Sequence, residues 1–137
     1  MNATHLPFVA VALVCASLGA YLAVSSRGES RLDHANAHLL AGRNAEVVAE
    51  LEGLEGETAL RAAALRGRAY RNSGRLEAAR KGLRTAARRD PNSWVLQRDY
   101  AEVLLALGRR AKARARMSRA KALNPRMVLP PGFVERR

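Results

Sequence analysis

A pattern of small and apolar residues recurs after 34 residues in the second half of the chain. The stretch GRLEAARKGLRTAARRDP begins at Gly74 and ends at Pro91, and GRRAKARARMSRAKALNP begins at Gly108 and ends at Pro125. Small residues and large apolar residues return at matching positions, whereas most other positions differ. A fixed period of this length predicts stacked supersecondary units, each of which buries its apolar face against its neighbours.

The apolar residues within one copy return at helical spacing, as Leu76, Ala79, Leu83 and Ala86 do. The glycine at the start of each copy can take the left-handed conformation that ends a helix, and the proline stops the following helix. Each unit is therefore predicted to be two helices joined by a short turn. Helices are predicted at about 5–27, 29–41, 44–53, 57–72, 76–89, 93–107 and 109–122.

This pattern resembles the tetratricopeptide repeat, whose unit is 34 residues of helix, turn and helix. The small residues Gly67, Ala79 and Ala86 stand at the family's small positions, and Tyr70 stands at its aromatic position. The second copy departs from the family at Leu104, where an aromatic residue is usual. The resemblance implies an all-α fold, in which a short α-solenoid of helix-turn-helix repeats follows the N-terminal segment.

A weaker copy lies upstream, with Ala35 at the small position and Gly42 at the turn. Its spacing to the next unit is 32 residues rather than 34, and no proline closes it. The resemblance then covers about 28–125. The chain is predicted to divide into an N-terminal segment 1–26, a repeat domain 27–125 with units at about 28–57, 58–91 and 92–125, and a tail 126–137 whose Val128, Leu129 and Phe133 pack on the last unit.

The first 26 residues carry no charged side chain when His5 is counted as neutral. A helix over residues 6–24 would cover roughly the 30 Å hydrocarbon core of a bilayer. A retained transmembrane anchor is favoured over a cleaved signal, which normally has a basic start, and over a buried helix. The expectation is a single-pass protein of a bacterial cytoplasmic membrane. Arg27 and Arg31 give too small a bias to decide on which side the repeat domain lies.

The formal net charge is +12, from 24 basic and 12 acidic residues. Because there is one cysteine, no intramolecular disulfide can form. The low aromatic content argues against a reader of single-stranded nucleic acid. His34 and His38 would share a helical face, but no cysteine is available to join them, so no metal site is predicted. The sequence contains no catalytic or cofactor-binding motif, and the chain is predicted not to be an enzyme.

The resemblance also implies a binding surface, because the first helix of each tetratricopeptide pair lines a concave groove that receives a peptide or a partner helix. An arginine-lined groove favours an acidic segment or a C-terminal carboxylate, since a guanidinium group can bind a carboxylate with two parallel hydrogen bonds. The family's carboxylate clamp for chaperones is not expected, because only Asn36 matches it, while Leu32, Leu65, Val95 and Asp99 stand at its other positions. The predicted groove residues are Asn36, Arg61, Arg68, Arg71, Asn72 and Arg98.

The last predicted helix carries a dense basic surface, made of Arg109, Arg110, Lys112, Arg114, Arg116, Arg119 and Lys121. A terminal helix must be polar on its outer face, which explains part of this charge. The sequence predicts a membrane-tethered scaffold that binds a protein partner through the arginine-lined groove, in a bacterial envelope or assembly complex. The alternative is electrostatic binding of an anionic lipid or polymer through residues 109–121. No nucleic-acid recognition fold and no small-molecule substrate are expected.

Overall fold

A computed structural model describes residues 6–54, 56 and 58–133 of the chain. Within this part the chain forms helices and no strands, so the all-α prediction is confirmed. The elements are α1 (Leu6–Leu40), α2 (Asn44–Glu50), α3 (Thr58–Asn72), α4 (Leu76–Arg89), α5 (Trp94–Ala106), α6 (Arg110–Leu123) and the short 3-10 helix η1 (Pro131–Phe133).

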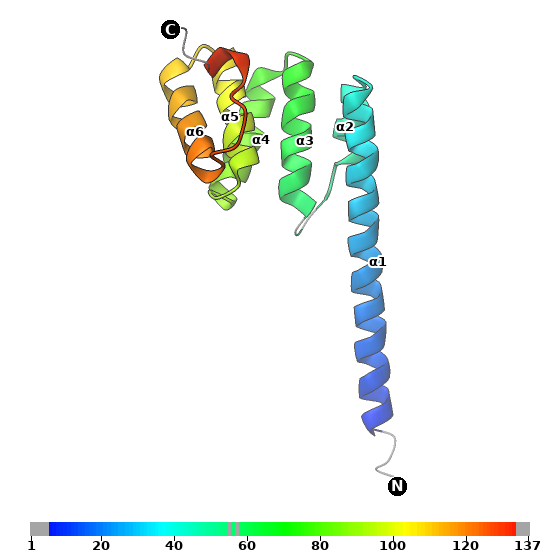
Figure 1. The fold of residues 1–137 in the computed structure, drawn as a ribbon. Coiled ribbons are helices and arrows are strands. Elements are labelled where there is room, and N and C mark those ends of the chain that lie inside the picture. Colours follow the sequence, from blue (N-terminus) through cyan, green and yellow to red (C-terminus); the bar gives the residue numbers. More distant parts are fainter. Residues whose placement is uncertain (1–5, 55, 57, 134–137) are drawn as a thin grey trace.

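The helices stack in chain order, as Figure 1 shows. Each helix from α2 to α6 contacts the one before it. In addition, α1 contacts α3, and α3 contacts α5, so these three helices form one layer of the stack. The contact order is that of a solenoid in which each helical pair packs on the next pair. The N-terminal part of α1 extends past the end of this stack.

The same turn ends α1, α3 and α5. Gly42, Gly74 and Gly108 have φ angles of 73°, 73° and 72°, in the left-handed region that favours glycine. After the second glycine, the backbone N–H of Arg75 donates to the carbonyl of Tyr70 at 2.8 Å, which is the hydrogen bond of a Schellman motif. The N–H groups that follow the other two glycines make the equivalent bond, from Arg43 to His38 and from Arg109 to Leu104.

The central core lies where α3, α4 and α5 meet, around Leu83. This side chain has no exposed surface and packs in a cluster with Ala79, Leu104 and Ala113, among others. A Cβ atom added to Gly67 of α3 would lie 2.6 Å from Cγ of Leu83. Because real Cβ atoms do not approach carbon this closely, any larger residue at this position would force the Leu83 side chain or the helices to shift.

The packing of Gly67 on Leu83 predicts a substitution effect that changes sign. Gly67→Ala is expected to destabilise the chain by about 1 kcal/mol, because overpacking outweighs the gain in helix propensity. In a Leu83→Ala background the same change is expected to stabilise by about 0.5–1 kcal/mol, because the clashing atoms are absent. Urea unfolding of the wild type, both single variants and the double variant measures the four free energies. The same sign in both backgrounds would contradict this packing.

The predicted helix break near residue 28 is absent. Gly28 lies inside α1 and is buried against Thr58, whose Cγ2 would lie 3.1 Å from a Cβ atom added there. One glycine inside a helix costs only about 1 kcal/mol, which contact with a neighbouring element can offset. A single helix therefore joins the uncharged N-terminal stretch to the first unit of the stack.

No helix in the described part of the chain is long and apolar enough to cross a membrane. The predicted single-pass membrane location is wrong on this finding. A span needs about 20 consecutive, predominantly apolar residues, and the helix expected to supply it continues through Arg27, Glu29 and Arg31 into the stack. Residues 1–5 of the predicted anchor lie outside the described residues.

The C-terminal tail returns along the last pair of helices. Met127 is buried against Ala101 and Met117, and Leu129 and Phe133 pack beside them, the last two as predicted. Val128 instead is 89% exposed. This tail covers part of the apolar surface that a following unit would otherwise bury.

Candidate functional site

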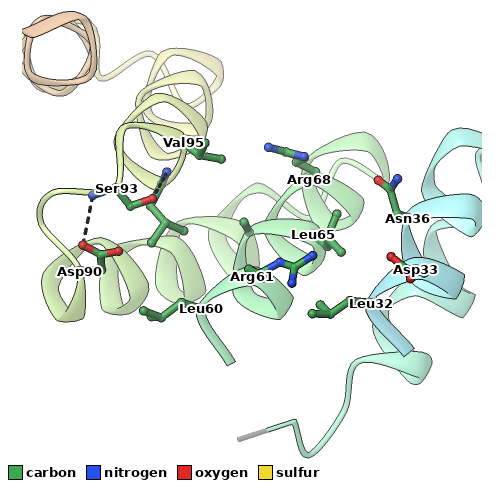
Figure 2. Close-up of a pocket in the computed structure, with 12 residues that line it drawn as sticks. Leu32, Asp33, Asn36, Leu60, Arg61, Leu65, Arg68, Asp90, Ser93 and Val95 are labelled. Atoms are coloured by element: carbon green, nitrogen blue, oxygen red, sulfur yellow. Dashed lines mark hydrogen bonds between the residues drawn. The ribbon is translucent and has the colours of Figure 1, made fainter. Parts of the chain in front are cut away.

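A pocket of about 530 Å³ opens between α1, α3 and α5, and Figure 2 shows the side chains around it. Its wall is largely apolar and comes from all three helices. Polar side chains stand among these apolar groups, and two of them, Asp90 and Ser93, belong to the turn before α5. The apolar lining consists of Leu32, Leu60, Ala64, Leu65, Val95 and Leu96.

Three of the predicted groove residues line this pocket. Asn36 of α1 and Arg61 and Arg68 of α3 are among its lining residues, as Figure 2 shows. Arg71 and Arg98 lie outside the lining, although both belong to the layer formed by α1, α3 and α5. Asn72 is the last residue of α3, is exposed, and does not join the pocket.

The positions that correspond to the family's carboxylate clamp meet in the pocket. Leu32, Leu65 and Val95, which stand at three of these positions, line the same cavity as Asn36. Three aliphatic side chains thus occupy the place where a clamp would present polar groups. The pocket suits an apolar side chain better than an isolated carboxylate.

The groove arginines are paired with carboxylates of the chain itself. Nη1 of Arg61 lies 2.5 Å from Oε2 of Glu29 on α1. Nε of Arg68 donates to Oδ2 of Asp99 on α5 at 2.8 Å, and Arg71 pairs with Glu102 one turn further along α5. Each ion pair joins neighbouring helices of the layer formed by α1, α3 and α5.

Asp99 is the most deeply buried carboxylate among these pairs, with a side chain 3% exposed. It accepts hydrogen bonds from Arg68 and from Arg98, whose Nη2 lies 2.8 Å from Oδ1. Burial lowers the pKa of Arg71, the negative charge of Asp99 raises this pKa, and the neighbouring guanidinium groups lower it. Asp99 therefore holds together a cluster of like charges that would otherwise repel.

The ion pairs differ in how exposed they are. The side chains of Arg61 and Glu29 are 59% and 52% exposed, so solvent and salt screen their attraction. The Arg68 side chain is half-buried and its partner is almost fully enclosed. Arg61 is therefore the groove arginine whose carboxylate is most easily exchanged for another.

The carboxylates that pair with the groove arginines were not predicted from the sequence, although their spacing along the chain could have indicated them. Glu29 precedes Arg61 by 32 residues, and Asp99 follows Arg68 by 31. This separation is close to one repeat, and it brings equivalent faces of neighbouring first helices together. Acids at this distance from each groove arginine could have been sought in the sequence.

The predicted basic surface divides into anchored and exposed side chains. Nη1 of Arg116 donates to Oε1 of Gln97 at 3.1 Å, and Lys121 donates to the carbonyl of Met127 at 2.8 Å. The exposed group contains Arg110, Lys112 and Arg114. Two residues of the predicted basic surface remain. Arg109 lies 3.5 Å from Glu77, and Arg119 donates to the carbonyl of Pro91.

Residues 70–126 match the model of a protein family described as tetratricopeptide repeat. The matched stretch begins near the end of α3 and ends just after α6, and it contains two of the three glycine turns. Comparisons with curated proteins and with solved structures give no match. Residues 70–126 of the chain therefore carry tetratricopeptide repeat sequence.

Proposed function

We propose that the chain is a non-enzymatic scaffold that binds a short segment of a partner protein in the pocket between α1, α3 and α5. The family supports this role in general terms, because tetratricopeptide repeats are protein-interaction modules. The observation that carries the proposal is an open, apolar pocket with one weakly held arginine, Arg61, at its edge. The units at 28–57, 58–91 and 92–125 together form this binding surface.

The chemistry of the pocket favours a segment that combines an apolar side chain with a neighbouring carboxylate. The aliphatic wall formed by Leu32, Leu65 and Val95 accepts the apolar side chain and removes it from water. The carboxylate pairs with Arg61 and displaces Glu29, since the attraction within this exposed pair is weak. An arginine fork then holds the incoming carboxylate with two hydrogen bonds.

The other polar groups of the pocket have different parts. Asn36 is exposed, and its amide can donate to and accept from the backbone of a bound segment. Asp90 accepts from the backbone N–H groups of Asn92 and Ser93, both at 3.1 Å, and so shapes the turn before α5. Arg68 is held by Asp99 and adds positive charge without being free to move.

Selection from a random peptide library with the full chain as bait tests the proposal without a known partner. Enriched peptides are expected to place Asp or Glu beside Leu, Ile, Phe or Met. Synthetic peptides of the enriched sequence are expected to lose about tenfold in affinity for Arg61→Ala, or about 1.4 kcal/mol. Val95→Arg, which fills the apolar wall with a charge, is expected to weaken binding at least as much.

A charge reversal gives the sharper outcome. Selection on Arg61→Glu is expected to enrich Lys or Arg where the wild type enriches an acid. Arg66→Glu is the matched control, because it makes the same change on α3 outside the pocket lining, and its peptides should keep the acid. If the peptides enriched on the wild type lacked an acid, or if peptides selected on Arg61→Glu still preferred one, Arg61 would not be the residue that binds the partner's carboxylate.

A further inference from the structure

A second cleft, of about 490 Å³, lies between α4 and α6, with Tyr100 and Leu104 of α5 among its lining residues. It involves none of the residues that line the pocket described above. Its walls carry two rows of cations, one on each helix. The basic residues that line this cleft, called the cationic cleft below, are Arg80, Arg84, Arg109, Lys112, Arg116 and Arg119.

The charge of the cationic cleft is largely uncompensated. Among the described residues that line it, none is acidic. Glu77 pairs with Arg80 at 2.5 Å and lies 3.5 Å from Arg109. One carboxylate thus faces two of the six guanidinium or ammonium groups, and the cleft keeps a strong positive potential.

Two arginines of the cleft are positioned by neutral acceptors. Nη1 of Arg116 donates to the side-chain oxygen of Gln97, and Nε of Arg119 donates to the carbonyl of Pro91 at 3.1 Å. Gln97 is fully buried, and its amide nitrogen in turn lies 3.2 Å from the same Pro91 carbonyl. The guanidinium of Arg116 also stands over the ring of Tyr100, 5.4 Å from its centre. These contacts fix the direction of both guanidinium groups and leave their charge available.

The cationic cleft therefore differs from the groove arginines, which are paired with carboxylates. Arg68 is balanced by Asp99 and Arg71 by Glu102, so an anion would have to displace a buried partner there. In the cleft, Arg84 and Lys112 are exposed, and Arg116 needs to give up no acid. Pre-positioned and uncompensated cations are what a site for an oxyanion requires.

We propose that the cationic cleft binds a linear multivalent oxyanion, namely a chain of phosphate groups. The basic residues of α6 follow one face of the helix, and Lys112 to Arg119 span about 10 Å along the axis. Arg84 and Arg80 of α4 face them across the cleft. A short linear anion lying along the cleft would have cations of α4 on one side and cations of α6 on the other, and one arginine guanidinium group can bind two phosphate oxygens. This site is separate from the pocket and does not depend on the proposed function.

The cleft favours a phosphate chain over single-stranded nucleic acid. Proteins that bind single strands without sequence preference offer aromatic faces on which bases stack. The aromatic ring in the described lining of this cleft, Tyr100, is buried, and Arg116 stands over its face. The cleft can therefore contact phosphate oxygens but offers no ring for a base.

Isothermal titration calorimetry of the full chain with inorganic tripolyphosphate at low salt tests the proposal. We expect binding at a single site that weakens as salt is raised, because the interaction is electrostatic. The double variant Arg84→Glu, Lys112→Glu is expected to bind at least about 30-fold more weakly. The milder pair Arg84→Gln, Lys112→Gln should lose about tenfold, and circular dichroism checks that both variants remain helical.

The matched control is the double variant Arg27→Glu, Arg126→Glu. It makes the same change in net charge at exposed positions that do not line the cleft. Its affinity for tripolyphosphate is expected to stay within about threefold of the wild type. An equal loss in this control would show that the anion senses overall charge, and it would overturn the proposal. A thymidine oligonucleotide of equal charge that binds more tightly than tripolyphosphate would overturn it in favour of nucleic acid.

Discussion

Leu83→Ala is expected to lower the free energy of unfolding by about 2–5 kcal/mol, because it removes a fully buried side chain and leaves a cavity. Leu83 belongs to the cluster in which α3, α4 and α5 meet, so the loss weakens two successive units and the contact between them. In thermal unfolding the midpoint should fall by roughly 10–20 °C. Amide hydrogen exchange should quicken first in these helices.

Leu40→Ala is the matched control for this change. It removes the same atoms from a leucine that is 83% exposed, at the end of α1. The control should change the free energy of unfolding by less than about 0.5 kcal/mol. If the two variants unfolded at the same urea concentration, the core would not lie where α3, α4 and α5 meet.

The repeated skeleton was predictable from sequence because its positions have narrow physical requirements. Gly74 and Gly108 must adopt positive φ angles, and Gly67 must leave room for Leu83. Few residue types satisfy such requirements, so these residues recur while the exposed positions vary. The helix ends from α3 to α6 follow from these turns and lie within one residue of the expected positions.

The course of the first helix was harder to predict. An uncharged stretch indicated an anchor, and the helices predicted at about 5–27 and 29–41 placed a break near residue 28. Local propensity does not show that Gly28 packs on Thr58, a residue of α3 that is distant in the sequence. Tertiary contact therefore decided whether the glycine ended a helix or remained inside one.

The candidate site was predictable in its outline but not in its charge. The family's geometry indicated the face that carries Asn36, Arg61 and Arg68, and these three side chains do line one pocket. Its arginines were expected to be available for a partner, but each has a carboxylate from a neighbouring helix. The acids lie about one repeat away, so a count of charges along a single helix could not find them. The uncompensated cations lie instead between α4 and α6.

Asp99→Ala is expected to lower the free energy of unfolding by about 2–4 kcal/mol, although it removes a single acid from a very basic chain. The carboxylate of Asp99 accepts from Arg68 and Arg98, and its charge also supports the buried Arg71. Without it, three guanidinium groups share Glu102 and repel one another in a half-buried setting. Urea unfolding at neutral pH measures the loss.

Two further variants separate charge from the general effect of truncation. Asp99→Asn keeps the shape and one acceptor oxygen, so it should lose about half as much stability as Asp99→Ala if charge compensation and hydrogen bonding contribute similarly. Asp33→Ala removes an exposed carboxylate from α1 and should change stability by less than about 0.5 kcal/mol. Because the Asp99 carboxylate is enclosed, added salt should not remove its contribution, in contrast to that of the exposed Arg61–Glu29 pair. If Asp99→Ala and Asp33→Ala were equally stable, the groove arginines would need no internal acid. They would then be available for a partner after all.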